Sequence, residues 1–502
     1  MNASPYTTAG VLNSSTISFL HWVIPYLSMK PEPHVVGGFL RDVLLDRSTN
    51  DLDLVIDGDA LVAASHLANV AGGTFIVLDE ARQIARVVLS HKGETWRLDL
   101  SSMNGDLLEN LARRDFTIDA MSIPLGKLLA DDWQESIVDP FGGRADLEAN
   151  LVRVVTPDVF KEDGGRLLRA VRLAASLSFN IEAVTRCLIR RDATFLSTTS
   201  GERIRDELLA ILSSFNAVRH VYILDELKLL SQIFPELEEG RGVTQPKEHY
   251  WDVFWHNVET VGAIEGLLER TLMPAWILEP VKWNEDLCAY FHEVVGDGHT
   301  RSTLLKLAGL LHDISKPATR SVSETGRIRF YGHHSHGAIV AHNILQRLRM
   351  SKRSAHIIET SIEYHLRPGQ MSQGTELPTD RAVYRYFRSA GEVAIDILYL
   401  NLSDYVAARG PLLEKGEWDA YANMVRYIMK TGLTQKKTPE AHRLIDGHRL
   451  MKDLNLNPGP LLGQLLQMIS EAEAIGEVTT KDEALALAKE KILTGDKEET
   501  FA

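Results

Sequence analysis

The stretch from Val35 to Ile56 changes its spacing of apolar and polar positions twice. It opens with two valines and a Gly-Gly pair, continues as FLRDVLLD with apolar residues at helical spacing, and ends as NDLDLVI. This pattern predicts a strand, a glycine turn, a short helix and a second strand. On the second strand Asp51 and Asp53 alternate with apolar residues. Because strand side chains repeat every two residues, both carboxylates should point to one face, with Cα atoms about 7 Å apart.

Two carboxylates at that spacing can hold the same divalent cations. The adjacent Gly37 and Gly38 permit close approach of a ligand to the backbone, and the helix after them presents free N–H groups to an anion such as a triphosphate. A metal clamp beside a phosphate cradle suits nucleotidyl transfer. Taken singly, an Asp-x-Asp is usually a solvated strand edge and a Gly-Gly is usually a turn. The prediction therefore depends on their combination and order.

Three more strands are predicted after a helix at residues 59–71, in GGTFIVLD, IARVVLS and TWRLDLS. In the last of these, Trp96 and Leu98 alternate with Arg97 and Asp99. Asp99 is therefore a candidate third carboxylate beside the first two. The alternative is an aspartate that only caps the end of a strand.

The run LARRDFTIDAMSIPL follows a short helical pattern. Two adjacent guanidiniums, Arg113 and Arg114, are costly to bury unless they meet an anion, and arginine matches the geometry of phosphate. The run therefore predicts contact with an anion such as a phosphate. A structural ion pair with Asp115 is the alternative.

A further charged group follows Pro157 and Asp158, which are helix-start signals. Its members are three or four residues apart and are predicted to share one helical face: Glu162, Asp163, Arg166 and Arg169. One interpretation is a row of ion pairs on a helix surface. The more specific interpretation is recognition of a base edge, because Asp accepts a hydrogen bond from the cytosine amine and Arg donates to the acceptor atoms of that base. Gly164-Gly165 is unusual inside a helix, where each Gly costs up to about 1 kcal/mol against Ala.

From about residue 216 the pattern predicts helix after helix, including LAGLLHDISKP, FYGHHSHGA, EYHLRP and LNLSDYVAARG. A buried His-Asp doublet with further His and Asp residues on nearby helices can bind one or two metal ions. The alternative for each histidine is a satisfied residue of the core. The ordered set favours the metal.

Composition narrows the class of protein. The 502 residues predict about three domains, and two cysteines, Cys187 and Cys288, support neither a disulfide framework nor a zinc site. A reducing cytoplasm fits. Residues 14–29 are expected to form an amphipathic helix, since no run reaches the about 18 apolar residues of a membrane span.

The net charge of −14 argues against indiscriminate nucleic-acid binding. It still allows an RNA held on a local surface. Arginines concentrate between residues 161 and 219, and a second basic run spans 347–353. Each run is either such a surface or an ordinary solvated helix face.

The segment at 35–56 resembles the signature of the polymerase-beta nucleotidyltransferase superfamily. With Arg113-Arg114-Asp115 and the Glu-Asp-x-x-Arg at Glu162, it resembles the class II tRNA nucleotidyltransferase and bacterial poly(A) polymerase family. The resemblance implies an α+β fold: a nucleotidyltransferase head with a mixed sheet, then an all-α neck, body and tail. The implied division is a helix at 1–30, the head at 31–155, the neck at 156–215, an HD-like body at 216–435 and a tail at 436–502.

The resemblance also implies roles for individual residues. Asp51, Asp53 and Asp99 would be catalytic, the first two holding Mg²⁺. The nucleotide and its triphosphate would be bound by Gly37, Gly38, Arg41, Asp42, Arg113, Arg114 and Asp115. The base of the nucleotide would be recognised by Glu162, Asp163, Arg166 and Arg169. A divalent transition metal in the body would be held by His256, His312, Asp313 and Asp404, with His333 and His365 as auxiliary ligands.

The predicted activity is template-independent addition of C, and of A, to a tRNA 3′ end from CTP and ATP, with release of pyrophosphate (EC class 2.7.7). The tRNA and the two nucleotides are the expected partners, with no membrane. Only SSMNGDLLEN separates the strand ending in RLDL from LARRDF. In the family, shortening of this region accompanies enzymes that add only the two C residues, so the prediction leans to CC addition. The family usually has Asn where this chain has Asp119, and no role is assigned to that residue.

Three alternatives remain open. The chain could be a poly(A) polymerase, although those members are typically more basic. It could be mainly an HD-type phosphohydrolase acting on phosphate esters or 2′,3′-cyclic phosphates, with an RNA-binding head. It could also be a binding protein without catalysis, against which the intact Asp-x-Asp argues.

Overall fold

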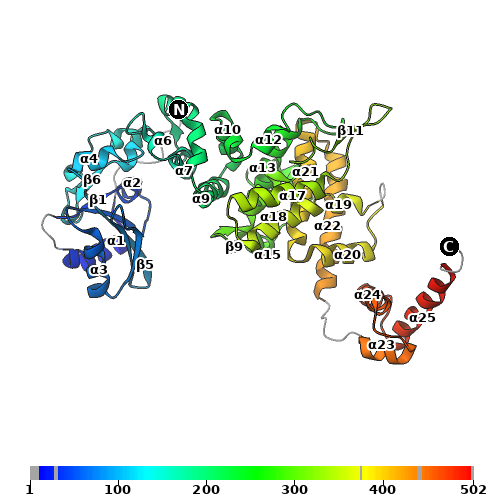
Figure 1. Ribbon diagram of the computed structural model, residues 1–502. Helices are drawn as coiled ribbons and strands as arrows, with labels where there is room; N and C mark the ends of the chain where they lie inside the picture. Colours follow the sequence, from blue (N-terminus) through cyan, green and yellow to red (C-terminus); the bar gives the residue numbers. More distant parts are fainter. Residues whose placement is uncertain (1–10, 28–31, 373–375, 438–443, 499–502) are drawn as a thin grey trace. The chain divides into compact units, whose positions relative to one another are not determined.

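A computed structural model of the chain describes residues 11–27, 32–372, 376–437 and 444–498 (Figure 1). The chain divides into two compact units. Unit 1 comprises Met1–Phe215 with Ile223–Ile233, and unit 2 comprises Asn216–Tyr222 with Phe234–Ala502. The predicted five-part division is finer than these two units and stays a prediction.

Unit 1 is built on a six-stranded mixed sheet of order β3-β4-β5-β2-β1-β6. Its strands are β1 His34–Val36, β2 Asp51–Ile56, β3 Thr74–Asp79, β4 Ile84–His91, β5 Glu94–Ser102 and β6 Ser122–Pro124. The β2–β5 pair is parallel, and the other pairs are antiparallel. The α+β prediction and the mixed sheet of the head are confirmed.

Helices cover this sheet: α1 Ser14–Val23, η1 Ile24–Leu27, α2 Gly38–Leu44, α3 Ala60–Ala71 and α4 Leu107–Ala112. Helix α3 packs on β4 and β5 through small residues such as Ala60 and Ala64. The ring of Phe19 in α1 stacks on Trp96 of β5 at 3.9 Å between centroids. The helix predicted at 14–29 is confirmed as α1 and η1 up to residue 27, and its last two residues lie outside the described part of the chain.

Short elements lead from the sheet into helices. They are η2 Thr117–Asp119, η3 Leu125–Lys127, η4 Trp133–Ser136, α5 Gly143–Glu148, β7 Leu151–Val152, α6 Val159–Glu162, α7 Gly165–Leu177, β8 Asn180–Ile181, α8 Ala183–Asp192, η5 Ala193–Thr198, α9 Gly201–Ser213, α10 Ala217–Glu226 and α11 Leu230–Ile233. Helix α7 buries its apolar face against α9.

The prediction that one helical face carries Glu162, Asp163, Arg166 and Arg169 is wrong. Helix α6 ends at Glu162, and Asp163 is extended with φ −153° and ψ 106°. The Asp163 carboxylate accepts a hydrogen bond from the N–H of Gly165 at 2.9 Å, which starts the next helix. A side chain that bonds its own backbone two residues on offers an alternative to a continuous helix.

Unit 2 is helical with small two-stranded ribbons. It contains α12 Pro235–Glu238, α13 Val253–Glu269, α14 Ala275–Leu278, α15 Glu285–His292, β9 Val294–Gly296, β10 His299–Thr300, α16 Arg301–Leu311, β11 Arg320–Val322, β12 Ile328–Phe330, α17 His333–Arg347, α18 Lys352–Tyr364, α19 Arg367–Gln370, α20 Asp380–Ala390, η6 Gly391–Val393, α21 Ala394–Arg409, η7 Gly410–Leu412, α22 Lys415–Lys437, α23 Gly447–Leu454, α24 Pro460–Ala474 and α25 Lys481–Glu498.

Helix α13 lies at the centre of this unit, between α16 and α21. It is buried on nearly all sides, as expected for a helix that is apolar all round. Helices α23, α24 and α25 enclose a separate small core that includes Leu450, Leu465 and Ile469. Within the described ranges, no helix has the length and apolar character needed to cross a membrane.

Candidate functional site

Asp51 and Asp53 lie on one face of β2, because the intervening Leu52 and the following Leu54 are fully buried on the other. The parallel register places Asp99 of β5 directly beside Asp53. On the opposite side, Asp53 is aligned with Val36, the last residue of β1 before Gly37. The sheet therefore brings the three predicted carboxylates to one place beside the glycine turn.

The three carboxylates differ in their partners. Asp99 accepts two hydrogen bonds from Arg86 of β4, at 2.7 and 2.8 Å, and Asp51 lies 3.3 Å from Arg97. Asp53 forms no ion pair with a described residue. Burial raises its pKa to about 6; Arg114 opposes the shift, whereas Asp99 adds to it. A carboxylate without an ion-pair partner on this face suits a divalent cation.

Gly37 is required by close contacts on this side of Asp53. Its φ is +73°, and a Cβ added there would lie 2.6 Å from Asp53 Oδ2 and 2.8 Å from Arg114 Nη1. The Arg114 side chain makes no ion pair with a described carboxylate, and its Nε is buried without a hydrogen-bond partner. Burial lowers the pKa of Arg114. A buried guanidinium with unused donors next to the carboxylates fits a phosphate group.

Other predicted nucleotide-binding residues form an internal ion-pair network. Arg41 bonds Asp119 at 2.7 Å and Asp42 at 3.0 Å, while Arg169 of α7 lies 2.9 Å from Asp115 and 3.6 Å from Asp119. Asp119 is almost fully buried. Burial alone would raise its pKa, but the surrounding arginines lower it. The role left open for Asp119 is therefore to hold these arginines with an ionised carboxylate.

The predicted base-reading residues are brought together only in part: Glu162, Asp163 and Arg166 are neighbours, whereas Arg169 pairs with Asp115 and Asp119. Asp163 is bound by Arg203 of α9, at 3.0 and 2.8 Å. Arg166 donates to Glu162 at 3.2 Å and to the carbonyl of Arg113 at 2.9 Å. The Arg113 side chain is exposed.

The sequence interpretation did not give Arg203 of α9 a role. Gly164 and Gly165 lie beside its contact with Asp163. A Cβ on Gly165 would lie 2.6 Å from Arg203 Nη2, and one on Gly164 would lie 2.1 Å from the carbonyl oxygen of Phe195. The close backbone carbonyl therefore requires glycine at 164, whereas a side chain at 165 would displace the end of the Arg203 side chain.

A second polar cluster lies in unit 2, where all six predicted ligands meet. His256 Nε2 is 3.2 Å from His312 Nε2, 3.2 Å from Asp313 Oδ2 and 3.1 Å from Asp404 Oδ1. Asp313 also faces His333 at 3.2 Å and His365 at 3.7 Å through Oδ1. Within the described residues these are two groups of candidate metal ligands that share Asp313.

The donor atoms of this cluster fit a metal. Asp313 Oδ1 and the Nε2 atoms of His333 and His365 are buried without a hydrogen-bond partner. Ligands about 2.1 Å from one ion lie roughly 3.0 to 3.5 Å from one another. Most pairs in the His256 group lie at 3.1 to 3.2 Å, and His312 and Asp404 lie 3.7 Å apart. Lys316 and His249, which the sequence interpretation missed, also line the cluster: Lys316 Nζ lies 2.5 Å from Asp313 and 3.5 Å from His249.

Comparison with known proteins matches three segments to family models. Residues 33–153 match the poly A polymerase head domain, 178–240 match a probable RNA and SrmB-binding site of polymerase A, and 285–408 match the HD domain. Asp51, Asp53, Asp99 and Arg114 fall in the first segment. His312, Asp313 and Asp404 fall in the last, and His256 precedes it.

The chain is similar over nearly its full length to curated proteins. It is 33% identical to an A-adding tRNA nucleotidyltransferase of Deinococcus radiodurans, covering 93% of this chain and 96% of that protein. It is 30% identical to a CC-adding tRNA nucleotidyltransferase of Thermus thermophilus, covering 93% and 95%.

Solved structures share the fold. A Thermotoga maritima CCA-adding enzyme complexed with tRNA superposes with a TM-score of 0.61 at 21% identity, covering 96% of each chain. A CCA-adding enzyme with CTP gives 0.63 at 20% identity, again covering 96% of each chain.

Proposed function

The chain belongs to the tRNA nucleotidyltransferase and poly(A) polymerase family, and we propose from this premise that it adds nucleotides to the 3′ end of tRNA. The names of its full-length relatives support this substrate. The observation that carries the proposal is the position of Asp51 and Asp53 on one face of β2, next to Gly37 and Arg114.

In this reaction the terminal 3′ hydroxyl releases its proton to solvent, its oxygen forms a bond to the α-phosphorus of the nucleotide, the bond from that phosphorus to the β-phosphate oxygen breaks, and pyrophosphate leaves. Asp51 and Asp53 would hold Mg²⁺, which would neutralise the charge that develops on the α-phosphate and activate the hydroxyl. Arg114 donates to the departing phosphates, and Gly37 leaves them room beside Asp53. Asp99, held by Arg86, is the third candidate carboxylate.

The selection of the base falls to Asp163 and Arg166. An ionised Asp accepts from the amine of cytosine or adenine, and Arg donates to a ring acceptor. Arg169 is tied to Asp115 and Asp119 in the head, so it acts by positioning α7 rather than by touching the base.

We propose CC addition as the first candidate. Only residues 103–106 separate β5 from α4, which leaves no room for a long mobile loop at this point. The 33% identity to an A-adding relative favours a second candidate, addition of the terminal A. An HD-type hydrolase as the main function is not favoured, because the full-length relatives carry transferase names.

The His-Asp cluster of unit 2 would bind a divalent transition metal through His256, His312, Asp313 and Asp404, since imidazole and carboxylate together suit such ions. His333 and His365 would complete a second position. This metal site is separate from the proposed Mg²⁺ site.

The test is incorporation of each of the four nucleotides into three tRNA transcripts, ending before CCA, after the first C and after CC. A CC-adding enzyme extends the first two with CTP and leaves the third unextended. An A-adding enzyme extends only the third, with ATP. No incorporation into any transcript by folded, magnesium-supplied protein would refute the proposed function.

A further inference from the structure

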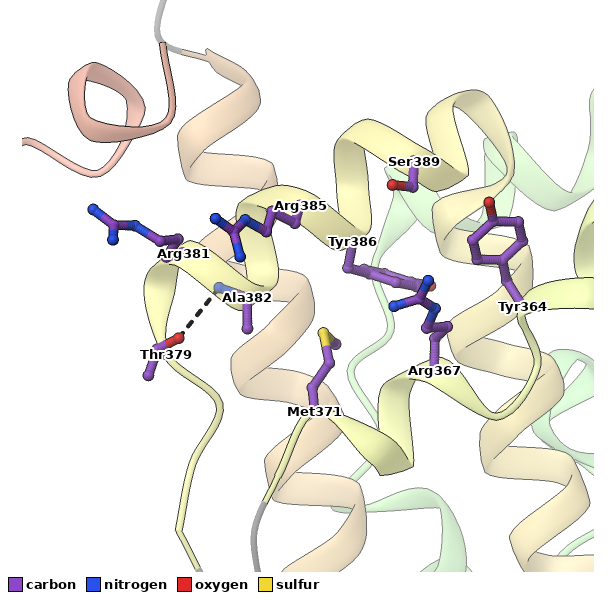
Figure 2. Close-up of a pocket in the computed structure, with 9 residues that line it drawn as sticks. All are labelled: Tyr364, Arg367, Met371, Thr379, Arg381, Ala382, Arg385, Tyr386 and Ser389. Carbon is purple, nitrogen blue, oxygen red and sulfur yellow. Dashed lines mark hydrogen bonds between the residues drawn. The ribbon is translucent and has the colours of Figure 1, made fainter. Parts of the chain in front are cut away.

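A cavity of about 300 Å³ opens in unit 2 between the end of α18, α19 and α20 (Figure 2), and none of the residues that line it is a candidate ligand of the His-Asp cluster, although Tyr364 directly precedes His365. Among the residues that line it are Tyr364, Arg367, Met371, Arg381, Arg385 and Tyr386. Figure 2 shows Arg367 beside the Tyr386 ring, with Arg381 and Arg385 extending from α20. Three guanidiniums therefore border one small cavity in a chain whose net charge is −14.

The three arginines are only partly neutralised. Arg385 uses Nε and Nη2 on a single oxygen of Glu471, and Arg381 uses Nη2 on Glu477, at 2.5 Å. Arg367 is exposed and pairs with no carboxylate among the described residues. Since each guanidinium has five N–H donors, all three keep donors for a further acceptor.

The wall of the cavity includes two tyrosine rings and a methionine beside its polar and charged residues. The guanidinium of Arg367 lies 5.6 Å from the centre of the Tyr364 ring. Tyr386 is held in place by a 2.6 Å hydrogen bond from its hydroxyl to the carbonyl of Ala394. Tyr364 and Met371 are half-buried, so each still presents surface. An aromatic and arginine wall of this kind stacks an unpaired base.

We propose that this cavity binds RNA, taking one backbone phosphate on Arg367 and Arg385 and an adjacent unpaired base against Tyr364. Charge and stacking together favour RNA over an acidic peptide, which would use the arginines and leave the aromatic wall without a partner. The identification of that RNA as tRNA depends on the proposed function. The cavity itself is a second, separate contact in unit 2.

The experiment measures the dissociation constant of the full-length protein for a tRNA transcript lacking its 3′ CCA. Arg367→Glu is expected to weaken binding at least tenfold, and Arg367→Lys to weaken it less, because lysine keeps the charge and loses the planar fork. Loss of one phosphate contact should also reduce the slope of log Kd against log salt by about 0.7 to 0.9. Arg388→Glu is the matched control, with the same charge change on exposed surface of α20 outside the cavity.

Equal affinity of Arg367→Glu and Arg388→Glu for the transcript would overturn the proposal. The proposal would also be overturned if Arg367→Glu weakened the binding of AMP and left the affinity for tRNA unchanged, because the cavity would then bind a free nucleotide. Both variants should keep the melting temperature of the wild type. Failure of the wild type to incorporate nucleotides refutes the proposed function alone, since the binding measurement does not depend on catalysis.

Discussion

The guanidinium of Arg203 donates two hydrogen bonds to the carboxylate of Asp163, Nη1 to Oδ1 at 3.0 Å and Nη2 to Oδ2 at 2.8 Å. This contact joins α9 to the break between α6 and α7. Partial burial would raise the pKa of Asp163, but the bonds from Arg203 and from the Gly165 N–H outweigh it and lower the pKa. Asp163 is thus kept ionised, oriented and able only to accept, as reading a base amine requires.

Arg203 should therefore affect the selectivity of the enzyme for one nucleotide over the others. Arg203→Ala is expected to reduce the ratio of kcat/KM for the preferred nucleotide over the other three by about tenfold, since Asp163 can then rotate. Arg203→Lys should recover part of this ratio. Single-turnover incorporation with each nucleotide measures it.

Arg190→Ala serves as the control, because Arg190 also forms a half-exposed ion pair, with Glu226. Arg203 is 55% exposed, so its loss should change the free energy of unfolding by less than about 1 kcal/mol. A uniform loss of activity with every nucleotide would contradict a role in selection.

Gly37→Ala tests the close approach of Asp53 and Arg114. The new methyl group would meet both side chains below 3 Å, so incorporation should fall at least a hundredfold as they are displaced. Gly72→Ala has a similar φ of +71° and meets nothing within 4 Å, but its ψ is 36°, against −147° at Gly37, so it controls for positive φ alone. Gly72→Ala should lose about 1 to 2 kcal/mol of stability, and Gly37→Ala about 1 to 3 kcal/mol. Equal activity in the two variants would refute the placement of Gly37.

Asp53→Asn removes the half-buried carboxylate next to Arg114. Incorporation should fall by about a thousandfold or more, because the proposed Mg²⁺ would lose a ligand and would no longer stabilise the charge that develops in the transition state. Asp57→Asn, just past the end of β2 on exposed surface, should act as the wild type. Isothermal titration with Mg²⁺ should show weakened binding for the first variant alone.

Asp119→Asn leaves Arg41 and Arg169 without their shared buried carboxylate. Asparagine can still accept one hydrogen bond, so we expect a loss of about 2 kcal/mol in the free energy of unfolding, measured with urea. The pKa of Asp119 is lower in the folded protein than in the unfolded chain, where it is about 3.9. The stabilisation that Asp119 gives is therefore fully present above this unfolded pKa, and it is lost as the pH falls through the folded pKa.

The difference between Asp119→Asn and wild type should therefore be constant from about pH 8 to about pH 5 and shrink below about pH 4. Asp158→Asn, which removes an exposed partner of Lys161, is the control and should leave unfolding unchanged. A difference that grows on acidification would contradict an ionised Asp119.

The metal site proposed for unit 2 can be tested by elemental analysis of purified protein. Asp313→Asn should lose all bound metal, because Asp313 belongs to both ligand groups, and His333→Gln should lose only the second position. His342→Gln, on the same helix α17 but paired with Glu359 at the surface, should keep the full content. Retention of metal by Asp313→Asn would rule out this site.

Much of the head could be predicted from local pattern. Alternation fixed Asp51 and Asp53 on one face, and the positive φ of Gly37 is the kind of backbone that a Gly-Gly between strand and helix indicates. The ordered His and Asp residues of the rear helices met as the family resemblance implied. These features depend on residue spacing along single elements, which the chain itself carries.

Only the tertiary structure decided which charged groups face each other. The sequence analysis treated Arg41, Asp115 and Arg169 as candidate ligand-binding residues. In the structure Arg41 and Arg169 both contact Asp119, and Arg169 also pairs with Asp115. The Asp163–Arg203 contact joins residues 40 positions apart, and it lies at the break between α6 and α7. Ion pairs depend on distances between helices and strands, and no local repeat in the sequence encodes these distances. The sequence therefore determined the helices and strands and the types of charged residue they carry. The packing of these elements determined which charged groups remain available to a ligand.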